Sequence, residues 1–68
     1  MELTIGEKIK NLREDNNLTQ FMLGKKLNMT QRKISYIENN QFEPSIQDII
    51  EICKFFNVSA DYLLGLKR

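Results

Sequence analysis

The chain has 68 residues and a net charge of +1, and hydrophobic residues make up 41% of it. This length and composition fit one small folded domain and exclude a disordered tail. No apolar run is long enough to cross a membrane, no signal peptide opens the chain, and one Cys without any His offers neither an internal disulfide nor a mixed metal site. We therefore expect a cytoplasmic protein, with a single domain over residues 1–68 and no metal or cofactor.

The charged side chains are unevenly distributed along the chain. Residues 1–33 carry seven basic and four acidic side chains, whereas residues 34–68 carry three basic and five acidic ones. Such an asymmetry is a weak indication of nucleic-acid binding. On charge alone, ordinary solvated helix faces are the better explanation.

The sequence predicts five short helices and no strand, beginning with a helix over residues 5–15. Thr4 and Glu7 have the spacing of a capping box, in which each side chain binds a free backbone N–H at the helix start. Apolar residues then recur at the spacing of one helical face, namely Ile5, Ile9 and Leu12.

Two closely spaced helices follow, over residues 20–27 and 31–39, and the rest of the chain is organised around them. Thr19 and Thr30 precede these helices, and each can cap one because a Thr hydroxyl accepts a free backbone N–H. Between them, Asn28 tolerates the left-handed conformation that ends a helix. Two capped helices separated by so short a stop are typical of a helix-turn-helix.

The last two helices complete the predicted core. Ser45 can cap a helix over residues 46–56, and Ser59 a final one over residues 60–64 that Gly65 ends. The residues expected to be buried in the central pair are Leu23, Leu27, Ile34 and Ile37, and those in the helix over residues 46–56 are Ile46, Ile49, Ile50, Cys53 and Phe56.

The chain resembles the Cro and phage-repressor type of helix-turn-helix domain, also called the xenobiotic-response-element type. The resemblance rests on the order and spacing of the segments IGEKIKNLRE, LTQ, LGKKLNMTQRKIS, YIEN and FFNVSADYLLG. It implies an all-α, five-helix, lambda-repressor-like domain with its core over about residues 5–64. It further implies a transcriptional regulator, most simply a repressor, that binds double-stranded operator DNA as a homodimer on a palindrome.

The exposed start of the helix over residues 31–39 carries the expected base contacts. A Gln amide can pair with adenine through two hydrogen bonds and an Arg fork with guanine, which favours base contacts by Gln31 and Arg32 over simple solvation. Lys33 can meet either a base or a phosphate. Tyr36 can touch a thymine methyl group or a sugar, or it can be a half-buried packing residue.

The resemblance also implies contacts to the DNA backbone. Gln20 stands where the family has a phosphate-binding glutamine, and free N–H groups at the start of its helix favour the same anion. The other residues expected to contact phosphate are Thr19, Thr30, Ser35 and Asn39, of which the two Thr can instead be plain caps.

Two further sets of residues have expected structural roles: a salt bridge that the resemblance implies, and a dimer surface expected from exposed apolar side chains. Arg13 and Glu38 match a pair that in relatives forms a partly buried salt bridge between the first helix and the end of the third. A partly buried charge needs a partner, so we expect a structural role for this pair. The expected dimer surface consists of apolar residues that a monomer leaves exposed, namely Tyr62, Leu64 and Leu66.

Several positions depart from the family pattern. Phe21 and Met22 replace residues that are usually polar, and an exposed aromatic beside a thioether can form a partner patch, although we prefer packing against the helix over residues 31–39 or the Phe42 loop. Glu43 lies in a loop that is usually basic. Gly24 replaces a small alanine, at an expected cost of about 1 kcal/mol.

These departures motivate a second hypothesis, an antitoxin or other protein-interaction regulator on the same fold, with a toxin or protein antagonist as partner. A third hypothesis is a DNA-binding domain that belongs to a longer sensor protein. The acidic residues are scattered and no Gly-rich phosphate loop is present, so the sequence indicates no enzyme.

Overall fold

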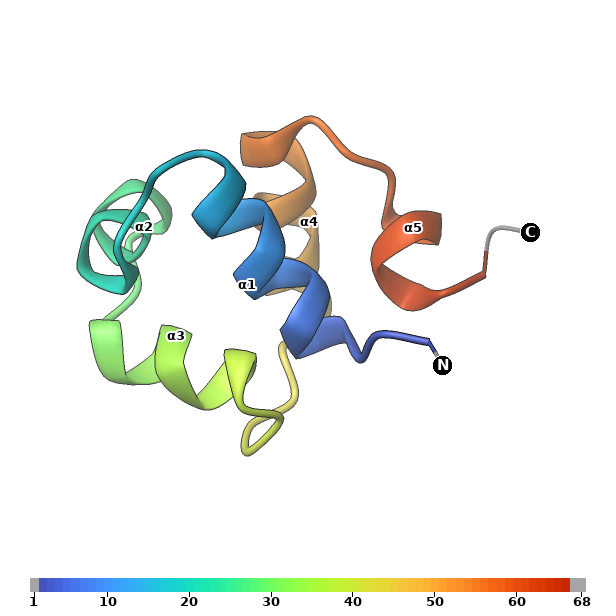
Figure 1. The fold of residues 1–68 in the computed structure, drawn as a ribbon, viewed down its shortest axis with the longest axis horizontal. Coiled ribbons are helices and arrows are strands. Elements are labelled where there is room, and N and C mark those ends of the chain that lie inside the picture. Colours follow the sequence, from blue (N-terminus) through green and yellow to red (C-terminus); the bar gives the residue numbers. More distant parts are fainter. Residues whose placement is uncertain (1, 67–68) are drawn as a thin grey trace.

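The computed structural model describes residues 2–66, which form five α-helices and no strand (Figure 1). This confirms the predicted all-α class and the number of helices. None of the described helices is long and apolar enough to cross a bilayer. The helices are α1 (Ile5–Asp15), α2 (Gln20–Leu27), α3 (Gln31–Glu38), α4 (Ile46–Phe56) and α5 (Ala60–Leu64).

Each helix begins at a hydroxyl side chain that accepts a hydrogen bond from the backbone N–H three residues later. In α1 the bond is returned, because the Glu7 carboxylate accepts from the Thr4 backbone N–H at 2.8 Å. In α4 Asp48 does the same for Ser45 at 3.1 Å. Such a cap stabilises a helix by roughly 1 kcal/mol. The five capping residues are Thr4, Thr19, Thr30, Ser45 and Ser59, as predicted.

Asparagine residues with left-handed backbone turn the chain between the helices. Asn28 and Asn57 end α2 and α4, and the N–H of each binds the carbonyl four residues earlier. Asn adopts this conformation more readily than other residues with a side chain. The predicted third helix is one residue too long, because Asn39 caps α3 at its end. The four such residues have φ between 57° and 60° and are Asn17, Asn28, Asn40 and Asn57.

The core lies where all five helices meet, and each contributes at least one side chain that is at most 1% exposed. The prediction for α4 is wrong in part, because Ile46 is 78% and Ile50 43% exposed whereas Ile52 is fully buried. Apolar residues occupy most positions of α4, so their spacing does not single out one face. The fully buried side chains are Ile9, Leu23, Ile34, Ile37, Ile52 and Leu63.

Two glycines allow the close approach that positions α3. In α2 a Cβ on Gly24 would lie 2.5 Å from the carbonyl oxygen of Met29, in the turn that leads into α3. In α1 a Cβ on Gly6 would press against the carbonyl of Ile37 and lie 2.7 Å from that of Glu38. The expected helix cost of Gly24 is therefore offset, because a larger residue would push α2 away from the turn. Figure 1 shows the result, with α2 and α3 together at one end of the molecule and α5 at the other.

Candidate nucleic-acid interface

The helix α3 turns one side to the core and the other to solvent. Ile34 and Ile37 are each 1% exposed, whereas Gln31 and Arg32 are exposed and Tyr36 is 44% exposed. Residues four apart lie on the same face of a helix, so Arg32 and Tyr36 are neighbours. Three of the four residues predicted to contact bases are therefore exposed on α3, and two of them, Arg32 and Tyr36, share one face.

Lys33, the fourth, is directed toward α4. Its ammonium group donates a hydrogen bond to Asp48 Oδ1 at 3.1 Å and lies 5.8 Å from the centre of the Phe42 ring. Burial disfavours the charged Asp48 carboxylate, but hydrogen bonds from Ser45 and Lys33 together outweigh it and hold the pKa of Asp48 below its ordinary value. The pair ties α3 to α4, and Lys33 would have to leave it before meeting a base.

The two helix N-termini of the helix-turn-helix carry Thr hydroxyls that act as caps. The Thr19 hydroxyl accepts from the Met22 N–H at 3.1 Å, and the Thr30 hydroxyl accepts from the Lys33 N–H at 3.0 Å. Both Thr residues are exposed. A hydroxyl that accepts one hydrogen bond still has its own hydrogen to donate. Capping and a phosphate contact are therefore compatible at both positions.

Arg13 and Glu38 are joined inside the domain, as the resemblance implies. Arg13 Nε donates to Glu38 Oε2 at 2.6 Å and Nη2 donates to Oε1 at 3.0 Å, and the Glu38 side chain is only 1% exposed. The hydrogen bond to Glu38 raises the pKa of Arg13, against the effect of burial. Arg13 Nη1 also donates to the Leu18 carbonyl at 2.8 Å. The pair thus links α1, the loop before α2 and the end of α3.

Gln20 belongs to the same network, which the sequence did not indicate. Its Nε2 donates to Glu38 Oε1 at 3.1 Å from the first position of α2. An amide nitrogen carries two hydrogens, so one remains for a ligand such as phosphate. At the same end of α3, just after Glu38, Asn39 Nδ2 donates to Ser35 Oγ at 3.4 Å. The predicted phosphate contacts therefore lie at the start of α2 and at the start and in the last turn of α3.

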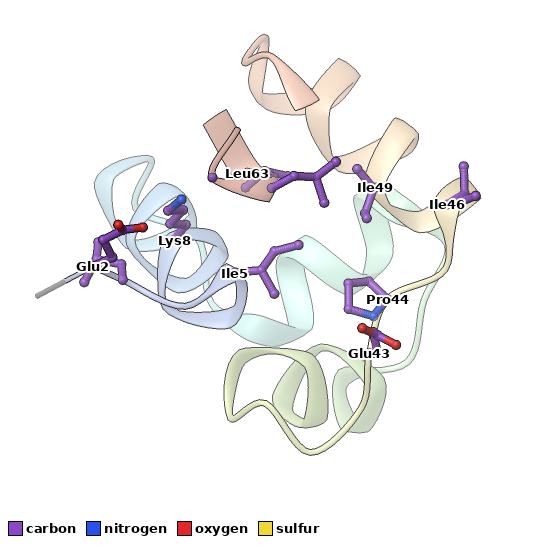
Figure 2. Close-up of a pocket in the computed structure, with 11 residues that line it drawn as sticks. Glu2, Ile5, Lys8, Glu43, Pro44, Ile46, Ile49 and Leu63 are labelled. Atoms are coloured by element: carbon purple, nitrogen blue, oxygen red, sulfur yellow. The ribbon is translucent and has the colours of Figure 1, made fainter. Parts of the chain in front are cut away.

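A hollow of about 530 Å³ lies between the start of α1, the start of α4 and α5. Figure 2 shows Ile5, Ile49 and Leu63 pointing toward one another inside it. The Lys8 ammonium group donates to the Tyr62 carbonyl at 2.8 Å.

The residues predicted to form a dimer surface are all exposed, with fractions of 40% for Tyr62, 47% for Leu64 and 67% for Leu66.

The aromatic and thioether pair on α2 is exposed. Phe21 is 57% and Met22 43% exposed, and the Lys25 ammonium group lies 5.5 Å from the centre of the Phe21 ring. This exposure favours a partner patch over the preferred prediction, in which one of the two packs against α3 or the Phe42 loop. Both side chains lie on the outer side of α2 because Leu23 and Gly24 occupy its buried side.

Comparison with known proteins gives consistent matches. A profile of the helix-turn-helix domain family matches residues 6–67. The HTH-type transcriptional regulator ImmR of Bacillus subtilis (strain 168) is 30% identical over 63 residues, which cover 93% of this chain but only 50% of ImmR, so the chain spans about half the length of that relative.

Solved structures agree with the sequence matches. The P22 c2 repressor protein in complex with a synthetic operator has a TM-score of 0.88 and 29% identity, with 97% of this chain and 100% of that one covered. A chain of the SinR protein/SinI protein complex has a TM-score of 0.81 and 31% identity, with 90% of this chain and 60% of that one covered. The chain belongs to the helix-turn-helix domain family.

Proposed function

We propose that this chain acts as a sequence-specific, double-stranded DNA-binding transcriptional regulator, a repressor that reads a palindromic operator with α3 in the major groove. The observation that carries the proposal is the exposure of Gln31, Arg32 and Tyr36 on α3, together with the capped N-termini of α2 and α3. Its relatives support it, because they include a regulator and a repressor bound to an operator. The proposed location is the cytoplasm, where a bacterial or phage operator lies.

The proposed contacts divide into those that specify and those that position. Arg32 pairs with a guanine and Gln31 with an adenine, and each bidentate pair contributes about 1–3 kcal/mol of discrimination. Gln20, held by Glu38, directs its second amide hydrogen to a phosphate. The remaining proposed phosphate contacts are Thr19, Thr30, Ser35 and Asn39.

We propose that two copies bind one operator. A single α3 of 8 residues reads few base pairs, whereas a two-fold dimer places two such helices about 34 Å apart, one turn of DNA. The exposed Leu64 and Leu66 supply an apolar surface that a second copy would cover. Leu64 also lines the hollow, so this surface continues from α5 toward α4.

Selection of binding sites from a random duplex pool, repeated at two salt concentrations, tests the proposal. We expect an enriched palindrome whose half-sites are one turn apart. Arg32→Ala should relax the preference at one position of each half-site, whereas Lys54→Ala, a loss of one exposed charge on α4, should leave the motif unchanged. Binding without an enriched motif that vanishes as salt rises would contradict the proposal, because charge alone would then hold the DNA.

A second candidate function is binding of a protein antagonist or toxin. It is supported by the exposure of Phe21 and Met22, and by the match to a chain of a complex between SinR and SinI. A complex that survives high salt and is lost in Phe21→Ala would support it. Unchanged operator binding by the same variant would show that the two functions use separate surfaces.

A further inference from the structure

A second, smaller hollow lies on the exposed side of α3, between this helix and the loop that follows it. Its volume is about 190 Å³, and we call it the α3 notch; it is lined by Thr30, Arg32, Lys33, Tyr36 and Phe42. The rings of Tyr36 and Phe42 are 44% and 46% exposed, so both remain open to a ligand. The exposed surface of the notch is almost entirely apolar.

Two basic side chains line the notch: Lys33 is paired with an acid on α4, and Arg32 is exposed. The Lys33 ammonium group is bound to Asp48 at 3.1 Å, so Lys33 offers the notch its aliphatic stem while its charge is neutralised on α4. The same ammonium group lies 5.8 Å from the centre of the Phe42 ring, which helps to hold that ring beside α3. An apolar hollow held open in this way gains most from an apolar group of the DNA.

The major groove offers one methyl group among the normal bases, the C5 methyl of thymine, and its other specific groups are hydrogen-bond donors and acceptors. We infer that the α3 notch receives the C5 methyl group of a thymine next to the base pair that Arg32 contacts, with Tyr36 and Phe42 as its aromatic walls. This inference rests on the proposed function, because it assumes that α3 enters the groove. It places one determinant of specificity, Phe42, outside the recognition helix.

Replacement of thymine by uracil tests the inference, because uracil lacks the methyl group and keeps every hydrogen-bonding group. Each thymine of the selected operator is replaced in turn, in both half-sites, and the Kd is measured by fluorescence anisotropy. We expect one position per half-site at which uracil weakens binding about fourfold (~0.8 kcal/mol for one buried methyl group) and about 15-fold when both half-sites are changed. Other thymine positions should respond little.

Two variants assign the effect to the notch. Phe42→Ala should bind the thymine and uracil operators equally while keeping the preference at the base pair read by Arg32. Phe21→Ala removes a ring on α2 that is somewhat more exposed than that of Phe42 and should keep the full difference between thymine and uracil. Phe42→Leu, which keeps an apolar wall, should retain part of the difference. Phe42 is 46% exposed, and circular dichroism will verify that the variants are folded.

The outcomes separate this inference from the proposed function. An enriched palindrome without any uracil effect would overturn the inference and leave the proposed function intact. A uracil effect that persists in Phe42→Ala would overturn it too, because other groups would then contact the methyl. If Phe42→Ala weakened binding to the thymine and uracil operators by the same factor, the difference between them would be kept, and Phe42 would contact a sugar instead. Absence of any enriched sequence would overturn both.

Discussion

Loss of the Glu38 carboxylate should destabilise the domain more than loss of any exposed acid. Glu38 accepts two hydrogen bonds from Arg13 and one from Gln20, and its side chain is 1% exposed. In Glu38→Ala the Arg13 guanidinium group, whose side chain is 10% exposed, loses its partner inside the domain. Removal of one member of such a buried pair costs about 3–5 kcal/mol.

That cost is large relative to the whole stability of the domain. At about 0.05–0.15 kcal/mol per residue, a chain of 68 residues has an unfolding free energy of roughly 3–10 kcal/mol. Urea unfolding followed by circular dichroism measures the change. With a slope of roughly 1 kcal/mol per molar urea, the midpoint should fall by about 3–5 M, or the variant should be unfolded without urea.

Glu14 provides the matched control. Its carboxylate lies 3.9 Å from Arg13 Nη2, but its side chain is 55% exposed, and exposed pairs contribute about 0–1 kcal/mol. Glu14→Ala should therefore hardly move the midpoint. The double replacement Arg13→Met with Glu38→Leu should recover much of the loss, since it leaves no unpaired charge. A loss below about 1 kcal/mol in Glu38→Ala, or an equal loss in Glu14→Ala, would refute this reasoning.

Two further predictions concern stability. Gly24→Ala should lower the free energy of unfolding by about 1–3 kcal/mol, and with it the thermal midpoint, because the new Cβ would lie 2.5 Å from the Met29 carbonyl oxygen. Helix propensity alone predicts stabilisation, and a raised midpoint would show that the turn can move. The folded-state pKa of Asp48 is lowered, so Asp48 stabilises the fold above its ordinary pKa, and this stability is lost as pH falls through the lowered value. Urea midpoints measured against pH should therefore fall less steeply in acid for Asp48→Asn, and parallel curves would contradict the assignment.

The helix boundaries could be predicted because their signals are local. A hydroxyl before each helix and an Asn or Gly after most of them set the ends, and only α3 differed, by one residue. The buried face of α4 could not be predicted in the same way. Its sequence places apolar residues on several sides, so only the packing of the other helices decides that Ile52 is buried and Ile46 exposed.

The interactions within the site were less accessible to sequence. The Arg13 and Glu38 pair came from the family resemblance rather than from spacing. The bonds from Gln20 to Glu38 and from Lys33 to Asp48 join residues 18 and 15 positions apart on different helices. Such contacts depend on how the helices cross, which the two close glycine approaches determine. The spacing of apolar residues in the sequence does not predict the angle at which the helices cross.

The division of α3 into a buried and an exposed side bears on how this protein could acquire new targets. Gln31 and Arg32 are exposed, so exchanges at these positions should be nearly neutral for folding. Ile34, Ile37 and Glu38 are buried and leave no such freedom. Under the proposed function, operator preference can therefore diversify by single substitutions at these positions, while the buried residues keep the helix at the same angle to the domain.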